Sequence, residues 1–105
     1  MKLEIEEGPA LTGLASAIER ARQAAAEVYA VALADEARRE FRSRSGRLAS
    51  SFVARDGAVH GAPYALILNG GSRHIPATNF IERAVERAKP DAERAMTDAI
   101  AKELG

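Results

Sequence analysis

The sequence contains no cysteine, no tryptophan and only four prolines among its 105 residues. Without cysteine there are no disulfide bonds, thiolate metal ligands or cysteine nucleophiles. No apolar run approaches the roughly 18 residues that a membrane-spanning helix needs. The first residues, MKLEIEEG, have no apolar signal core, so we expect neither membrane insertion nor secretion. The length predicts a single domain spanning residues 1–105.

The chain also lacks a net charge, since 15 basic residues balance 15 acidic ones. A dedicated nucleic-acid-binding domain would usually be clearly basic. Acidic and basic residues are, however, unevenly distributed along the chain. Residues 1–37 carry 7 acidic and 3 basic groups, net −4, whereas residues 38–60 carry 6 basic and 2 acidic groups, net +4. The placement of charge is therefore more informative than its total.

Large apolar side chains are scarce. Hydrophobic residues make up 47% of the chain, but much of that fraction is alanine, and 8 Leu, 6 Ile, 5 Val and 3 Phe give only 22 bulky residues in 105. That share lies close to the roughly 20% below which disorder is common. A small domain with so thin a core either folds weakly alone or completes its core by assembling with neighbours. We favour assembly.

The first half of the chain has a strong helical pattern. Residues 2–6 alternate as a short strand would, and Pro9 suits the first position of a helix that continues to about residue 42. A second stripe of apolar residues replaces the first along this helix, which indicates a bend or a change of packing partner. The two stripes are Leu14, Ile18, Ala21, Ala25, Val28 and Ala32, then Tyr29, Leu33, Ala37 and Phe41. We expect Gly46 to end the helix in a left-handed cap.

The second half predicts a small sheet followed by a helix. Strands are expected over residues 48–55, 58–60 and 64–68, the last the most buried, with Asp56-Gly57 as a hairpin turn and residues 69–77 as a loop. Asn79 is expected to cap the final helix, and Pro90 to kink or restart it. The expected inner face of that helix is Ile81, Val85, Ala88, Ala92, Met96 and Ala99. The order predicts an α+β fold, in which a long N-terminal helix and a C-terminal helix pack with an antiparallel sheet of three to four strands.

No constellation for catalysis or metal binding is present. The two histidines, His60 and His74, have no third ligand at a suitable spacing. No serine lies in a G-x-S-x-G turn, and the segment GGSR at residues 70–73 lacks both common phosphate-binding patterns. We therefore expect no enzyme activity, no catalytic residue, no metal, no cofactor, no small-molecule substrate and no membrane partner.

Five arginines crowd the end of the long helix and the residues after it. Three interpretations stay open: a solvated helix end that favours the helix dipole, a contact with the acidic N-terminal region of a neighbouring copy, and a DNA contact. The loop over residues 69–77 is a second candidate contact. The candidate contact residues are Arg38, Arg39, Arg42, Arg44, Arg47, Arg73 and His74.

Three short segments carry a resemblance to a known family. They read SGRLASSF at residues 45–52, YALILNGGS at residues 64–72 and PATNFIERA at residues 76–84. In order and spacing they resemble the T-G-x-L-x-x-S, Y-A-x-x-[apolar]-E-x-G-T and P-A-x-P-F-[apolar]-x-P-A patterns of small neck proteins of long-tailed phages. Gene product ten of the Hong Kong 97 phage typifies this family. The resemblance covers residues 10–90.

The segments also depart from the family patterns. Ser45 and Ser72 stand where threonine is usual, and Asn69 stands where the family has an acid. Asn79 and Arg83 replace prolines. The matching positions are expected to determine the fold rather than to catalyse: Gly46 lets the chain leave the helix for the sheet, Tyr64 opens the buried strand, and Phe80 anchors the last helix. The full set is Gly46, Leu48, Tyr64, Ala65, Gly71, Pro76 and Phe80.

The resemblance implies a function by assembly. Such a protein would be a structural subunit at the phage head–tail interface, where it completes or terminates the tail or joins it to the head. Its partners would be further copies of itself in a hexameric or dodecameric ring, other neck, connector or tail-tube proteins, and DNA passing through the channel. It would be made in the host cytoplasm and reside in the virion. The alternative is a small nucleic-acid-associated protein that uses the basic block from Arg38 to Arg47.

Overall fold

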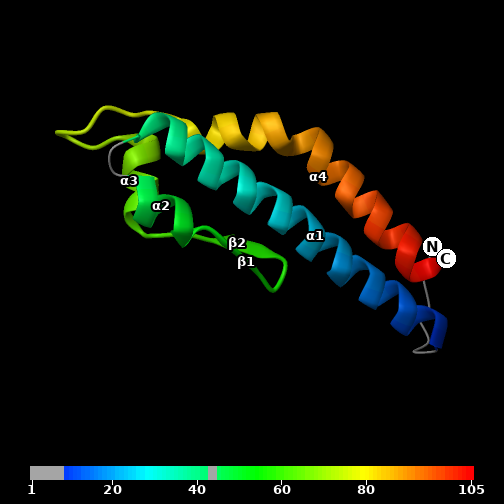
Figure 1. Cartoon of the computed structure of the whole chain (residues 1–105). Coiled ribbons are helices and arrows are strands. Elements are labelled where there is room, and N and C mark those ends of the chain that lie inside the picture. The colour runs from blue at the N-terminus through cyan, green and yellow to red at the C-terminus, as the bar shows by residue number, and fades with distance from the viewer. Residues whose placement is uncertain (1–8, 43–44) are drawn as a thin grey trace, which may run out of the picture.

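The structure is a computed structural model that describes residues 9–42 and 45–105 (Figure 1). The predicted strand over residues 2–6 lies outside the described residues. The elements follow the order α1 (Pro9–Glu40), α2 (Ser45–Ser51), β1 (Val53–Arg55), β2 (Ala58–His60), α3 (Tyr64–Gly70) and α4 (Phe80–Leu104). Two long helices lie side by side, and the short elements gather on one side of α1 (Figure 1).

The long helix is confirmed close to its predicted bounds. α1 begins at Pro9 and has 32 residues, which makes it about 48 Å long. Its sequence is rich in alanine, glutamate and arginine, which are strong helix formers, and Gly13 does not interrupt it. A helix of this length sets the shape of the molecule, whose extents are 54 × 27 × 20 Å. The fold is therefore elongated rather than spherical.

The core between the long helices is made almost entirely of alanine. Among the described residues, 15 hydrophobic side chains are buried, and all but Leu33, Leu48 and Phe80 are alanines. The α1 members are Ala17, Ala21, Ala25, Ala26, Ala30, Ala34 and Ala37, besides Leu33. Because alanine is short, the two helix backbones can approach closely. The prediction that Leu14 and Ile18 face inward is wrong, since they are 44% and 49% exposed.

α4 runs antiparallel to α1 and passes through Pro90 as one helix. Figure 1 shows that α4 changes direction along its length, as expected where proline removes a backbone hydrogen bond and crowds the preceding turn. Ala88 and Ala92 face inward as predicted, whereas Val85 and Met96 are 39% and 36% exposed, contrary to prediction. The buried face repeats every four residues through Phe80, Ala84, Ala88 and Ala92. The narrow stripe reflects contact with a single partner helix.

The hairpin is confirmed where its turn was predicted. β1 and β2 pair antiparallel, and Asp56 and Gly57 both have positive φ, at 55° and 76°. These are the dihedral signs of a type I′ turn. Gln23 of α1 holds the turn from both sides, because its amide nitrogen donates to the Ala54 carbonyl at 3.1 Å and its amide oxygen accepts from the Gly57 N–H at 2.9 Å. The hairpin is thereby fixed to α1.

One predicted strand is wrong, and another is a strand only over its last three residues, Val53–Arg55. The first half of the segment 48–55 is helix α2, so Gly46 lies inside a helix and not in a left-handed cap. The segment 64–68 is helix α3, which Tyr64 begins, and Leu66 is 71% exposed rather than buried. A short apolar run cannot by itself separate a buried strand from a helix, and Ala-Leu-Ile-Leu is compatible with both.

As a consequence the sheet is smaller than predicted. Within residues 9–42 and 45–105 it has two strands instead of three to four, and α4 packs along α1 and not on the sheet. The fold still mixes helix and sheet in the predicted order of a long first helix, a hairpin and a long last helix. The arrangement is dominated by the contact between the two long helices.

A small aromatic core lies where α1 ends and α4 begins. Phe80 is fully buried, and its ring meets Phe41 and Phe52 edge to face, with ring centroids 5.5 and 6.2 Å apart. Leu48 of α2 is 1% exposed in the same cluster. The prediction that Phe80 anchors the last helix is confirmed. Bulky apolar packing is thus concentrated at one end of the molecule.

Candidate assembly surfaces

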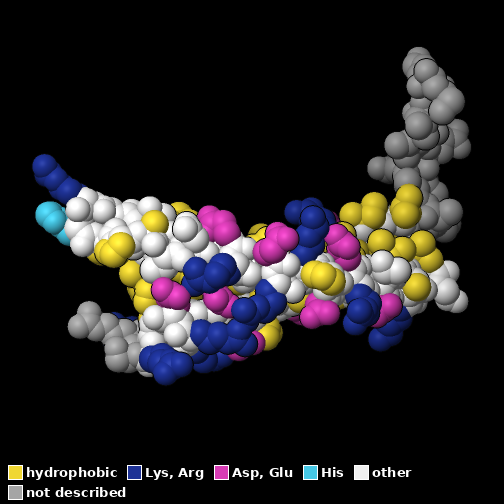
Figure 2. Space-filling model, turned by 90° about the horizontal axis from the view of Figure 1, so that it is seen from above, with side chains coloured by type: hydrophobic (Ala, Val, Ile, Leu, Met, Phe, Trp, Pro, Cys, Tyr) yellow, Lys and Arg dark blue, Asp and Glu magenta, His cyan; other side chains and the backbone are white. Residues whose placement is uncertain are grey.

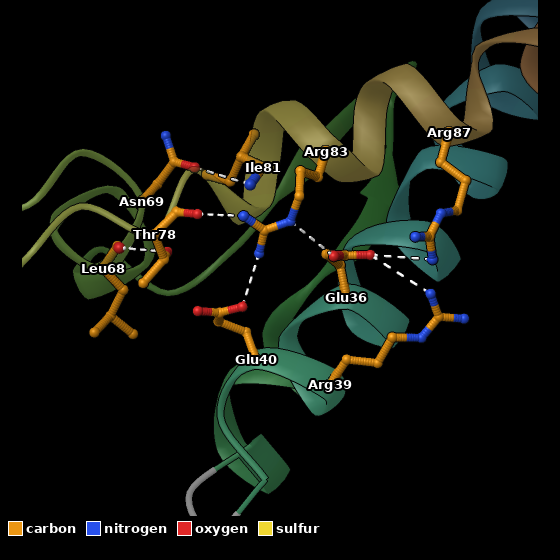
Figure 3. Close-up of polar contacts among 9 residues, drawn as sticks. All are labelled: Glu36, Arg39, Glu40, Leu68, Asn69, Thr78, Ile81, Arg83 and Arg87. Carbon is orange, nitrogen blue, oxygen red and sulfur yellow. Dashed lines mark hydrogen bonds and ion pairs between the residues drawn. The ribbon is translucent and has the colours of Figure 1, made fainter.

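A buried carboxylate links α1 to α4 next to the aromatic core (Figure 3). The Glu36 side chain is only 7% exposed, and it meets three guanidinium groups, those of Arg83 at 3.0 Å, Arg87 at 3.3 Å and Arg39 at 3.8 Å. A charged group so nearly removed from water needs partners, and three arginines supply them. This cluster fixes the register of the two helices.

Arg83 contacts further groups beside Glu36 (Figure 3). Its guanidinium also pairs with Glu40 at 2.8 Å and donates to the Thr78 carbonyl, so it ties α1, α4 and the loop before α4 together. At the far end of the helices, Arg20 pairs with Glu103 at 3.0 Å. Both ends of the helix pair are therefore closed by ion pairs in one antiparallel register.

The predicted basic block is divided by the structure. Arg38 pairs with Asp35 at 3.1 Å and Arg39 with Glu36, so both are partly neutralised within the chain. Arg42 and Arg47 are exposed, and none of the ion pairs between described residues involves them. Arg44 lies outside the described residues. The positive charge available to a partner is therefore smaller than the sequence count.

Asn69 organises the junction between α3 and α4. Its amide oxygen accepts from the Ile81 N–H at 2.8 Å, and its amide nitrogen donates to Glu82 at 3.0 Å. Asn69 thereby caps α4 from outside the helix. The predicted cap, Asn79, occupies the N-cap position in a left-handed conformation with φ 55° and makes no side-chain cap hydrogen bond. Asn79 is therefore the N-cap residue, as predicted, but the capping hydrogen bond is made by the Asn69 side chain.

This junction also perturbs one acid. The hydrogen bond from the Asn69 side chain lowers the pKa of Glu82, and its own backbone N–H and the nearby charge of Arg83 act in the same direction. The side chain is exposed, so the effect belongs to local hydrogen bonding rather than to burial.

The loop after α3 is pinned at its base and open at its tip. Gly71 has φ 82°, as its predicted role requires, and a Cβ there would lie 2.8 Å from the Ala77 nitrogen. Ser72 and Ile75 exchange backbone hydrogen bonds at 2.8 and 3.3 Å. Arg73 and His74, between them, are exposed. Figure 2 shows a basic side chain and a histidine projecting at one end of the molecule.

Many bulky apolar side chains lie on the surface, and we name two sets of them. We name the first the α3 patch: Tyr64, Leu66 and Ile67 of α3 with Ile75 of the loop, which are 41%, 71%, 47% and 39% exposed. The second, the terminal patch, is formed by Leu14 and Ile18 of α1 with Leu104 of α4, which are 44%, 49% and 55% exposed. Figure 2 shows hydrophobic side chains gathered at both ends of the molecule.

A groove of about 570 Å³ also lies between α1 and α4. It exists because Ala24, Ala32 and Ala88 are too short to fill the space between the two helices. Val31, 63% exposed, stands on its margin, and charged residues of both signs, Glu27, Asp35 and Asp91 with Arg39 and Arg87, surround it. Its surroundings are therefore mixed in charge, unlike the basic tip of the loop.

Sequence reasoning did not find the Glu36 cluster, the Asn69 cap or the exposure of α3. One signal was available: Glu36 and Glu40 are four residues apart, as are Arg83 and Arg87, and such spacing places each pair on one helix face. Only the antiparallel packing, which the sequence does not state, brings the two pairs together.

Within residues 9–42 and 45–105, no three His, Asp or Glu side chains cluster closely enough to hold a metal ion. No helix of the described ranges carries an apolar stretch long enough to cross a membrane. Comparisons with protein-family models, with curated proteins and with solved structures each return no match. The surfaces above therefore have to be interpreted from their own chemistry.

Proposed function

We propose that this chain is a structural subunit of a phage or prophage-derived neck, where it completes or terminates the tail or joins it to the head. The observation that carries the proposal is the distribution of apolar side chains between core and surface. Alanines fill most of the core, while Leu66, Ile67, Leu14, Ile18 and other bulky residues lie on the surface. Such residues gain burial only when a partner covers them. Function by assembly is what this distribution supports.

A second observation supports the resemblance on which the phage assignment rests. All three sequence segments contribute to the same buried cluster: Leu48 from the first, Ala65 from the second, and Phe80 and Ala84 from the third. Leu48, Ala65 and Phe80, each 15 or more residues from the next in the chain, thus meet in one core, with exposed fractions of 1%, 4% and 0%. If this chain had the fold of the resembled family, the three segments would be expected to pack together in this way.

The nucleic-acid alternative is weakened by the same structure. Arg39, Arg83 and Arg87 are held by Glu36, and Arg38 by Asp35, so these guanidinium groups already have carboxylate partners. Phosphate binding would have to break those pairs or rely on Arg42, Arg47 and Arg73. DNA binding by the isolated protein, weakening steeply with salt, would favour the alternative.

Deletion of the gene in a phage or lysogen that carries it tests the proposed function. We expect filled heads and tails that are unjoined or of abnormal length, counted by negative-stain microscopy, and infectivity restored by supplying the intact chain. Charge reversal at Arg42 and Arg47 should impair joining while the purified protein keeps its helical circular dichroism. Normal tailed and infectious particles after deletion would overturn the proposal.

A further inference from the structure

Asn69 and Gly70 are the last two residues of α3, and an asparagine followed by glycine is a reactive pair in a polypeptide. The side-chain amide carbon of the asparagine lies within reach of the next backbone nitrogen, and glycine has no side chain to hinder the approach. A methyl group added at Gly70 would meet no atom within 4 Å, so the space beside this residue is open. The other asparagine of the sequence, Asn79, precedes the buried Phe80 and lacks this openness.

In the folded chain the Asn69 side chain is held away from this reaction. Its amide oxygen accepts from the Ile81 N–H at 2.8 Å (Figure 3), and its amide nitrogen donates to Glu82 at 3.0 Å. The helix also withholds the attacking nitrogen, because a helical N–H points toward the carbonyl four residues earlier and not toward a neighbouring side chain. The reaction therefore requires the junction between α3 and α4 to open first.

This junction is small and partly exposed. α3 has only 7 residues, and a helix so short is marginal unless packing supports it. Ala65 is the one buried residue of α3. Asn69 is half-buried, and Gly70 and Glu82 are exposed. Local opening of the junction therefore costs less free energy than unfolding of the whole chain.

We propose that Asn69 is a modification site, at which opening of the junction permits conversion to aspartate or isoaspartate. The Gly70 nitrogen attacks Asn69 Cγ, a C–N bond forms, and ammonia leaves with the proton of the attacking N–H. Water then opens the resulting cyclic succinimide at one of its carbonyl carbons. Attack at Cγ restores the backbone and gives aspartate, whereas attack at the backbone carbonyl carbon gives isoaspartate, whose chain runs through Cγ. Asparagine and water thus yield a carboxylate and ammonium, and no other reactant is needed.

Either product hinders closure of the junction. Aspartate keeps an acceptor for the Ile81 N–H but has no N–H for Glu82, so two carboxylates would meet where the amide nitrogen and Glu82 Oε1 lie 3.0 Å apart. Isoaspartate lengthens the backbone and displaces the residue 69 carbonyl, which accepts from the Thr78 and Asn79 N–H groups at 3.2 and 3.0 Å. The change is one-way, because a carboxylate and ammonium do not re-form an amide in water.

The test follows the mass of the peptide that contains residue 69 while the full chain is incubated at neutral pH and one fixed protein concentration. The folded chain should convert at least about tenfold more slowly than the chain unfolded in urea. Glu82→Ala removes an acceptor of the Asn69 amide, so it should speed conversion severalfold in the folded chain and leave the rate in urea unchanged. Glu82→Gln keeps that acceptor and should convert at nearly the unaltered rate.

Two further variants complete the design. Glu86→Ala, which removes another exposed carboxylate one turn further along α4, is the matched control and should leave the rate unchanged. Asn69→Asp provides one product directly, and it should raise the pKa of Glu82 and lower the free energy of unfolding in urea. Circular dichroism confirms that each variant is folded.

The opposite results overturn the inference at separate steps. Equal rates in the folded and unfolded chains, or equal acceleration by Glu82→Ala and Glu86→Ala, would show that the junction does not control the reaction. Absence of conversion even in urea would show that residue 69 is not a reactive site. Unchanged stability of Asn69→Asp would refute the effect assigned to the product. None of these results bears on the proposed function, which therefore stands or fails separately.

Discussion

Two adjacent glycines at the end of α3 provide a sharp test of the loop geometry. Gly71 has φ 82° and ψ 171°, a region that only glycine populates readily, and a Cβ there would lie 2.8 Å from the Ala77 nitrogen and 3.0 Å from the Ile75 oxygen. Both neighbours are backbone atoms of a pinned loop and cannot rotate away. Backbone strain in this region costs about 1–3 kcal/mol, and with the added contact we expect Gly71→Ala to lower the free energy of unfolding by about 2–4 kcal/mol.

Gly70 is the matched control, because it is the last residue of α3 and a methyl group added there would meet no atom within 4 Å. Gly70→Ala should raise the free energy of unfolding by about 0.4–1 kcal/mol, since alanine lowers the entropy of the unfolded chain. Urea unfolding followed by circular dichroism, at one fixed protein concentration, measures both. Equal effects of the two substitutions, within about 0.5 kcal/mol, would refute the assigned backbone geometry.

Three further predictions concern the core, the helix contact and the α4 cap. Phe80→Ala should lower the free energy of unfolding by about 3–5 kcal/mol, because it empties the centre of the aromatic cluster, and calorimetry should find Phe80→Leu milder. Ala92→Leu should cost about 1–3 kcal/mol by overpacking the helix contact, whereas Val31→Leu, on an exposed position, should leave urea unfolding unchanged. Asn69→Ala should raise the pKa of Glu82 toward its ordinary value, and carbon NMR titration of the carboxyl group measures this shift. In the unaltered chain, the lowered pKa of Glu82 stabilises the fold at pH values above the ordinary carboxyl pKa. This stabilisation is lost as the pH falls through the lowered pKa of Glu82.

The sequence predicted well the features that depend on local chemistry. The long first helix follows from composition and spacing, and the hairpin turn follows from Asp56-Gly57, whose residue types tolerate positive φ. The burial of Phe80 also follows, because it is the one aromatic residue at the start of a helical pattern. Each of these outcomes was encoded within a few residues.

Features that depend on distant partners were predicted poorly. Residues 64–68 form a helix although their apolar run equally suits a strand, and Ala65 packs in one buried cluster with Leu33 and Ala37 of α1. The inner face of α4 is formed by Phe80 and three alanines, whereas Val85 and Met96 are 39% and 36% exposed. Tertiary packing decided these positions.

The candidate contact residues show the same division. Exposure at Arg42, Arg47, Arg73 and His74 agrees with their expected availability to a partner. The spacing of Glu36 and Arg39 on one helix allows their ion pair, but the contacts of Glu36 with Arg83, 47 residues away, and with Arg87 depend on the packing of α4. Charge counting along the chain finds a basic segment but not the carboxylates that neutralise it.

Sedimentation velocity of the isolated chain over a hundredfold range of concentration tests most directly the claim that this thin core is completed by assembly. The account predicts a closed oligomer that dissociates on dilution, with an unfolding midpoint that rises with protein concentration because only the folded state assembles. A monomer at every concentration, with a high unfolding midpoint independent of concentration, would contradict it.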